Sequence, residues 1–215
     1  MNPFDQGPAA AAMYDGWYAS PIGRRVLEVE AQCVKATLSP TARPWVDVGC
    51  GSGRLGELLA VELGLDPAPN LLRLARTRLR NAVRGVAEQL PLADGSIGAA
   101  MAVTVVEFLT DPKPAFREIR RVLAPGGAFA LGFLPAKGAW AARYRAEGKR
   151  GDEVFRAARF YTEGDLVALA GEVGFPVREV CSALFDAPHV VPSLRREQVA
   201  TPDAGFMVLR LEAVG

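Results

Sequence analysis

Short apolar runs alternate with amphipathic stretches along most of this chain. The runs predict seven β-strands, at residues 45–48, 61–65, 82–86, 99–105, 128–134, 177–183 and 206–211. Apolar positions at helical spacing predict helices at residues 20–38, 53–60, 68–80, 111–124 and 162–173. This alternation favours an α/β fold with a mostly parallel, doubly wound sheet and helices on both faces. The last two strands follow each other without a helix, so they could pair as an antiparallel hairpin at the sheet edge.

Length and composition narrow the class of protein. The 215 residues fit one domain, and half of them are hydrophobic, which is enough for a sizeable core. A net charge of +1 argues against a general nucleic-acid binder. No apolar run approaches the roughly 20 residues of a membrane span, and the N-terminal stretch lacks the basic segment of a secretory signal. We therefore expect a cytoplasmic protein without a membrane span.

Three cysteines, Cys33, Cys50 and Cys181, are widely spaced. Their odd number and spacing indicate neither a disulfide framework nor a zinc site. We expect three reduced thiols and no bound metal.

The stretch VDVGCGSG, residues 46–53, places three glycines directly after a predicted buried strand. In a doubly wound sheet, ligands bind beyond the carboxyl ends of the strands. Glycines there let a ligand approach the backbone, and the following helix offers unpaired N–H groups. Residues 51–56 also match the dinucleotide pattern GxGxxG. Two features count against a nicotinamide dehydrogenase: Asp66 lies closer to the glycines than the roughly 20 residues of that pattern, and the only histidine, His189, lies in a late loop.

Five segments, taken in order, resemble the class I S-adenosylmethionine-dependent methyltransferases. VDVGCGSGRL resembles their motif I, and LGLDPAPNLLRLAR resembles their second motif. RGVAEQLPLADGSI, FLTDPKPAFREIRRVLAPGG and ARFYTEGDLVALAGEVGF resemble the segments around strands four to six, so that the resemblance spans roughly residues 14–176. It is strongest to the small-molecule methyltransferases of ubiquinone and menaquinone biosynthesis. This resemblance implies a seven-stranded Rossmann-like sheet and S-adenosyl-L-methionine as cofactor.

The resemblance also implies roles for individual residues at the cofactor. Asp47 would order the glycine loop near the amino group of the cofactor, whose methionine part would face Gly49, Cys50, Gly51 and Gly53. Asp66 would accept hydrogen bonds from both ribose hydroxyls, although it could instead cap the next helix.

Adenine would lie near Pro67, Ala87, Glu88, Gln89 and Leu90. Val86 stands where many relatives have an aspartate that receives the adenine amino group, so Glu88 or a backbone carbonyl would take over that role. Gly98 replaces another frequent aspartate, which we interpret as a local packing change.

The acceptor side of the site is less defined by the resemblance. Thr104 and Val105 would border the methionine end of the cofactor. Glu107 is either a general base or a surface acid. Tyr14, Trp17 and Tyr18 would form an aromatic lid over the sulfonium, or would simply anchor a helix onto the core. We expect residues 1–40 to form this lid and its helix.

Residues 137–161 are predicted to form an insertion that would cap the substrate. Its candidate lining residues are Tyr144, Arg159, Phe160 and Tyr161, and the arginines could equally belong to a solvated surface helix.

These observations predict methyl transfer to an O, N, C or S atom of a small-molecule acceptor. Two alternatives stay open at this point: a non-catalytic protein that binds S-adenosylmethionine or S-adenosylhomocysteine, and a nicotinamide-dependent oxidoreductase. A nucleic-acid substrate is not expected. The sequence defines neither the acceptor nor the oligomeric state, monomer or homodimer.

Overall fold

The computed structural model describes residues 3–213. Its strands are β1 (Trp45–Val48), β2 (Leu63–Asp66), β3 (Ala82–Arg84), β4 (Ile97–Val103), β5 (Leu123–Phe133), β6 (Val177–Ala183), β7 (Arg196–Glu197) and β8 (Phe206–Glu212). They form one sheet in the order β3-β2-β1-β4-β5-β8-β6-β7. Strands β1 to β5 are parallel, whereas β8 is antiparallel to both β5 and β6. The predicted fold class and antiparallel pairing are confirmed, but β8 lies inside the sheet, and the short edge strand β7 was not predicted.

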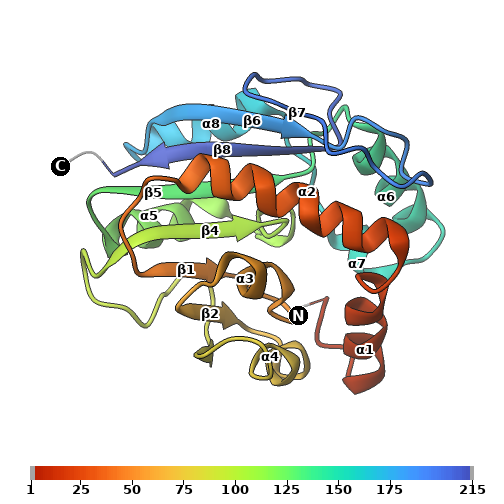
Figure 1. Ribbon diagram of the computed structural model, residues 1–215, viewed down its shortest axis with the longest axis horizontal. Helices are drawn as coiled ribbons and strands as arrows, with labels where there is room; N and C mark the ends of the chain where they lie inside the picture. Colours follow the sequence, from red (N-terminus) through yellow and green to blue (C-terminus); the bar gives the residue numbers. More distant parts are fainter. Residues whose placement is uncertain (1–2, 214–215) are drawn as a thin grey trace.

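Helices cover both faces of the sheet (Figure 1). They are α1 (Pro8–Trp17), α2 (Pro21–Leu38), α3 (Arg54–Leu59), α4 (Pro69–Ala75), the 3-10 turn η1 (Val106–Phe108), α5 (Pro112–Val122), α6 (Ala139–Lys149), α7 (Glu153–Ala157) and α8 (Glu163–Glu172). Helices α2 and α3 lie on one face, and α5 and α8 lie on the other. The insertion at 137–161 folds into α6 and α7, which the apolar pattern did not predict. Within residues 3–213, no helix combines the length and the apolar character needed to cross a bilayer.

Strand β5 shows how the alternation of side chains builds two cores. Ala128 and Ala130 face the core under α2, whereas Phe129 and Leu131 face the core under α5 and α8. The ring of Phe129 stacks on that of Phe175, with centroids 5.9 Å apart. Small residues on one face and large residues on the other allow α2 to lie close to the centre of the sheet.

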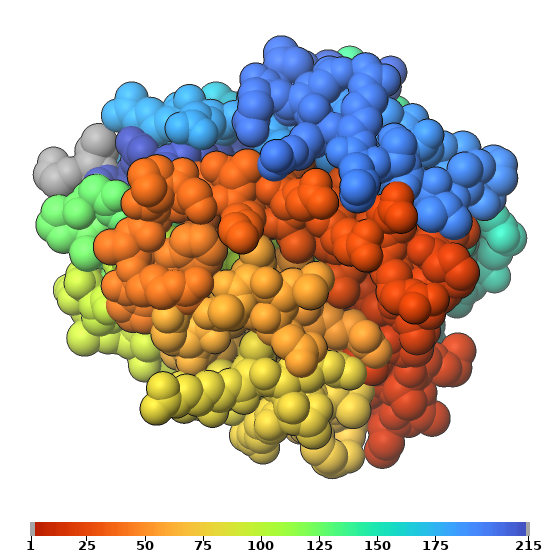
Figure 2. Space-filling view, viewed as in Figure 1, coloured from red at the N-terminus to blue at the C-terminus, as the bar shows by residue number. Residues whose placement is uncertain are grey.

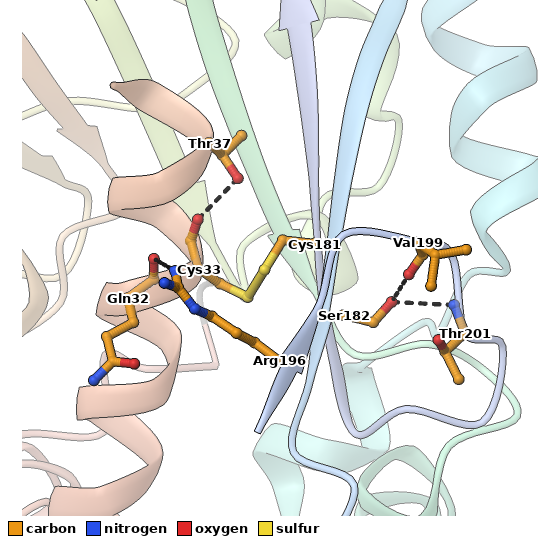
Figure 3. Close-up of a disulfide and its surroundings, with 8 residues drawn as sticks. All are labelled: Gln32, Cys33, Thr37, Cys181, Ser182, Arg196, Val199 and Thr201. Atoms are coloured by element: carbon orange, nitrogen blue, oxygen red, sulfur yellow. Dashed lines mark hydrogen bonds between the residues drawn. A yellow bond between two sulfur atoms is a disulfide. The ribbon is translucent and has the colours of Figure 1, made fainter. Parts of the chain in front are cut away.

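A disulfide joins helix α2 to strand β6 (Figure 3). Its cysteines, Cys33 and Cys181, are separated by 148 residues, and their Cα atoms lie 5.8 Å apart. Both side chains are fully buried. The expectation of three reduced thiols is therefore wrong for this pair, because the fold brings together two cysteines whose spacing in the sequence indicated no pairing. Cys50 is a free, buried thiol.

Two other segments contact helices α2 and α1. The segment before β8 lies over α2 (Figure 2), where Arg25 donates to the Pro192 carbonyl oxygen and Arg196 to that of Gln32. At the other end of the molecule, α1 lies beside α4. Helix α1 and the first turns of α2 thus lie at the carboxyl end of the parallel strands, whereas the rest of α2 runs back along the sheet.

Gly98 lies at the start of β4, where the loop before β1 crosses the sheet. A Cβ atom at Gly98 would lie 2.0 Å from the carbonyl oxygen of Ala42. No side chain fits in that space, which gives a physical reason for glycine here in place of the aspartate that the resemblance led us to expect.

Candidate active site

The glycine loop between β1 and α3 is held against β2 and against the residues that follow β4. The N–H groups of Gly49 and Cys50 both donate to the Leu65 carbonyl oxygen, at 2.7 and 2.9 Å. Gly49 has a φ of 76°, and a Cβ atom there would lie 2.4 Å from Cγ2 of Val105. Only glycine satisfies both the backbone angle and the space. The loop therefore presents bare backbone to whatever lies above it.

Asp66, the last residue of β2, connects the glycine loop to the start of α4. Its Oδ2 accepts a hydrogen bond from the Gly51 N–H at 2.8 Å, and its Oδ1 accepts one from the Ala68 N–H at 2.8 Å. The N-cap residue of α4 is Ala68, so Asp66 is not the helix cap that was the alternative interpretation. Each carboxylate oxygen accepts one backbone bond and keeps a lone pair for a ligand.

Asp47 lies beneath the glycine loop, within β1, and is 2% exposed. Burial, and to a lesser extent the charge of Asp66, raises the pKa of Asp47 to about 8. Burial also raises the pKa of Asp66. Both carboxyl groups are buried, and a positively charged ligand nearby would stabilise their ionised forms.

A cavity of about 690 Å³ extends from the glycine loop to the insertion. This volume is within the range of small-molecule sites, roughly 300–1,000 Å³. Twelve predicted site residues line it: Tyr14, Trp17, Tyr18, Gly49, Gly51, Asp66, Pro67, Ala87, Glu88, Thr104, Val105 and Glu107. Val86 also lies in the wall. The fold thus gathers, in one cavity, residues that are up to 93 positions apart in the sequence.

Five predicted site residues do not line this cavity: Asp47, Cys50, Gly53, Gln89 and Leu90. The first two are buried under the loop, and Gly53 caps α3. Leu90 belongs to the core under α5, and Gln89 is exposed. We therefore do not assign these five to direct ligand contact.

Helix α1 lies beside the glycine loop, and several of its residues line the cavity. The hydroxyl of Tyr14 would lie 3.1 Å from a Cβ atom on Gly51, and it is 3.3 Å from the hydroxyl of Tyr18. The rings of Trp17 and Tyr18 meet edge to face, with centroids 4.9 Å apart. Burial raises the pKa of both tyrosines, so they stay neutral and present uncharged rings to the cavity.

Glu107 lies in η1 at the far side of the loop and is 2% exposed. Its Oε1 accepts a hydrogen bond from the Leu134 N–H at 2.8 Å, and its Oε2 has no partner within the described chain. Burial raises the pKa of Glu107 to about 7 despite the bond from Leu134. Glu107 is therefore a buried wall residue and not the surface acid of the alternative interpretation.

Glu30 is a cavity residue that the sequence analysis missed. It lies on α2, is 7% exposed, and its pKa is raised to about 8, first by burial and then by the charge of Glu107. A signal was present in the sequence, because Glu30 interrupts the apolar stripe of α2 between Val26 and Cys33, and an unpaired acid is rare at such a position.

The insertion supplies the far wall of the cavity. Tyr144 and Phe160 line the cavity as predicted, together with Trp140 and Phe155. Tyr161 does not line it. Nor does Arg159, whose N–H donates to the Glu107 carbonyl oxygen at 2.7 Å and therefore supports η1 from outside.

Comparison with known proteins identifies the class to which this geometry belongs. Residues 46–131 match the family model described as a methyltransferase domain. A malonyl-[acyl-carrier protein] O-methyltransferase of Geobacter sulfurreducens is 31% identical over 206 residues, which cover 88% of this chain and 73% of that protein. The chain belongs to the S-adenosylmethionine-dependent methyltransferases.

Two further similarities concern particular relatives. A crystal structure from Thermotoga maritima, described as a methyltransferase and possible histamine N-methyltransferase, superimposes with a TM-score of 0.83 at 28% identity, and the match covers 94% of both chains. An uncharacterised protein of Mycobacterium tuberculosis is 40% identical over 196 residues, which cover 91% of this chain and 67% of that protein. The enzyme class, fold and cofactor predicted from the sequence are confirmed. The narrower resemblance to the quinone-biosynthesis enzymes stays a prediction.

Proposed function

We propose that this methyltransferase acts on a small-molecule acceptor bound in the part of the cavity between the lid and the insertion. The observation that supports this most is the continuity of the cavity. The glycine loop and Asp66 line one end, whereas Glu30 and the aromatic residues of α6 and α7 line the other. A donor and an acceptor could thus lie in one enclosure, as an in-line transfer requires.

The residues present fit the adenosyl part of the cofactor. Asp66 keeps one lone pair on each carboxylate oxygen, which suits a vicinal diol. Gly49 and Gly51 both line the cavity and both have a positive φ, which glycine adopts without strain. Val86 is 44% exposed and has no polar group, so we assign recognition of the adenine amino group to Glu88 or to a neighbouring carbonyl.

The lid has an electrostatic role and a shielding role. S-adenosylmethionine supplies a methyl group activated by its bond to a positively charged sulfur. The rings of Tyr14, Trp17 and Tyr18 attract a cation through their faces, and α1 excludes water from the cavity. The domain assignment, with residues 1–40 as lid and helix and 137–161 as substrate cap, is part of this proposal.

The named relatives differ in their acceptors. The Thermotoga protein is described as a possible histamine N-methyltransferase, and the Geobacter protein methylates an oxygen of malonyl-[acyl-carrier protein]. The first acceptor is a small amine, and the second is an acidic group on a carrier protein. Because buried acids line the cavity of this chain, a small acceptor without negative charge fits better.

Calorimetric titration with S-adenosylhomocysteine tests the cofactor assignment. We expect wild type to bind one molecule per chain. Asp66→Ala removes two charge-assisted hydrogen bonds, each contributing about 1.5–3 kcal/mol, so affinity should fall by at least about 100-fold. The same change in the exposed Asp94, which pairs with Arg121 away from the cavity, serves as control and should leave affinity unchanged.

Two results would contradict the assignment: equal affinity of Asp66→Ala and wild type, or tight binding of NAD⁺ in place of S-adenosylhomocysteine. Release of S-adenosylhomocysteine that depends on an added small molecule then tests transfer itself. If release occurred only with carrier-protein or nucleic-acid substrates, the proposal of a small acceptor would be refuted.

A further inference from the structure

Two acids in the cavity wall, Glu30 and Glu107, form no ion pair within residues 3–213. They come from different elements, α2 and η1, yet the charge of Glu107 raises the pKa of Glu30. The two side chains line the same cavity, and their carboxyl groups are within range of electrostatic interaction. Burying an ionised carboxylate without a partner is costly, so the pKa of both groups is raised in the free protein, and a cation that arrives with a ligand would stabilise their ionised forms.

The surroundings of Glu107 leave one oxygen available. Oε1 is held by the N–H group of Leu134, which fixes the orientation of the carboxyl group. Oε2 is buried and has no partner within the described chain. An oriented acceptor oxygen in the wall of a cavity is what a donor group on a ligand needs.

The protein does not neutralise these acids with its own cation. Arg143 is the one basic residue among the described residues that line the cavity. Its guanidinium forms an ion pair with Glu147 at 2.8 Å and donates to the Pro188 carbonyl oxygen at 2.8 Å. It lies 5.9 Å from the ring centroid of Trp140 and 6.0 Å from that of Tyr144, so it covers part of these two rings and pairs with neither Glu30 nor Glu107. The cavity wall is thus acidic overall, and a negatively charged acceptor would be repelled.

Aromatic rings form much of the wall around this acid pair. The centroids of Trp17 and Trp140 lie 6.5 Å apart, and those of Trp140 and Tyr144 lie 6.0 Å apart. The charge of Glu30 raises the pKa of Tyr144, although burial does so more strongly. Trp and Tyr rings attract ammonium groups, and they also offer flat apolar surface. Acids and rings together favour a ligand with an amino group on an apolar body.

On this basis we propose that the methyl acceptor is an amine, held through its ammonium group by Glu30 and Glu107 against the aromatic wall. The inference rests on the proposed function, and it specifies the acceptor atom as nitrogen. A neutral alcohol of the same shape would leave the carboxylates without a counter-charge, so the amine is preferred.

Glu107 can also accept the proton that the ammonium group must lose before its nitrogen is methylated. The bound ammonium gives one proton to the Oε2 atom of Glu107, which leaves a neutral amine with a free electron pair. That pair forms the bond from nitrogen to the methyl carbon, while the bond from this carbon to sulfur breaks and its electrons remain on sulfur. The product is a methylated ammonium, and the proton on Glu107 passes to solvent. Glu30 stays ionised beside the product and acts as a binding residue.

Binding of matched ligands to the protein saturated with S-adenosylhomocysteine tests the inference without a turnover assay. The probes are two pairs that differ in one group: 2-phenylethylamine with 2-phenylethanol, and tryptamine with tryptophol. We expect at least one amine to bind at least tenfold more tightly than its alcohol. Glu30→Gln should reduce that ratio to below threefold while the affinity for S-adenosylhomocysteine stays unchanged.

Glu28→Gln is the matched control, because Glu28 lies on the same helix but is exposed and pairs with Arg25. It should keep the wild-type ratio. The inference is overturned if no amine binds better than its alcohol, including the case in which neither binds, or if the ratio persists in Glu30→Gln. Failure of S-adenosylhomocysteine to bind would instead overturn the proposed function, and the first titration detects this separately.

Discussion

Asp15 attaches the lid helix α1 to the elements that carry the glycine loop. Its carboxylate accepts hydrogen bonds from Arg54, the first residue of α3, at 2.7 and 2.9 Å. Arg78, which follows α4, donates a third at 3.0 Å and also donates to the Ser52 carbonyl oxygen at 2.7 Å. Asp15→Asn preserves the size of the side chain and removes its charge. We expect this change to loosen the lid.

The size of the effect follows from the ionisation of Asp15. Burial opposes ionisation, but hydrogen bonds from Arg54, Ser52 and Arg78 outweigh it and lower the pKa from 3.8 to about 2. This change corresponds to about 2.5 kcal/mol. Because the pKa is lowered on folding, the contribution is fully present above pH 3.8 and is lost as the pH falls through 2. At neutral pH, Asp15→Asn should therefore weaken closure of α1 by up to about 2.5 kcal/mol, or roughly 70-fold.

Amide hydrogen exchange over residues 8–17 measures this closure directly. Glu57→Gln is the control, since Glu57 also faces Arg78 but at 3.8 Å and with 56% of its side chain exposed. We expect faster exchange of α1 in Asp15→Asn, unchanged exchange in the strands, and weaker binding of S-adenosylhomocysteine. Unchanged protection of α1 in Asp15→Asn, or an equal loss in Glu57→Gln, would refute the reasoning.

Three further predictions concern packing, pH and the thiols. Gly98→Ala forces a Cβ atom against the Ala42 carbonyl oxygen and should lower the free energy of unfolding, measured in urea, by about 1–3 kcal/mol. A loss below about 0.5 kcal/mol would contradict this. The pKa of Glu107 rises from 4.5 to about 7 on folding, so the contribution of its protonated form to stability is lost as the pH rises from 4.5 through 7. The free energy of unfolding of Glu107→Gln, relative to that of wild type, should therefore be about 3 kcal/mol higher at pH 8 than at pH 4.5. Parallel pH profiles of the two proteins would contradict the assignment. Because Cys33 and Cys181 are paired, maleimide in denaturant without reductant should label one thiol, and maleimide after reduction should label three, as counted by mass spectrometry. Three labels before reduction would disprove the disulfide.

The sequence predicts the parallel part of the fold well because local patterns determine it. The run at 99–105 corresponds to β4, and Ser20 with Pro21 begins α2, where the Ser20 hydroxyl accepts a hydrogen bond from the Gly23 N–H at 3.0 Å. Boundaries are less exact. The strand predicted at 82–86 ends at Arg84, and Val86 forms only an isolated bridge to Gln89.

Features that depend on contacts between distant segments could not be derived from local patterns. The pairing of Cys33 with Cys181 requires α2 to lie across β6, and nothing in the spacing of the cysteines indicates that. Glu30 lines the same cavity as Trp140 and Tyr144 of the insertion, and only the folded chain brings these residues together. The position of Glu30 in an apolar stripe was a usable signal, but nothing in the sequence indicated that Glu107 would line the same cavity.

A crystal structure of the complex with S-adenosylhomocysteine tests the central claim most directly. We predict the ribose hydroxyls within hydrogen-bond distance of the Asp66 carboxylate, and the sulfur atom on the side of the cavity that faces Glu107 and Tyr18. A nucleoside bound outside the glycine loop, or a sulfur atom that faces away from these two residues, would contradict the account.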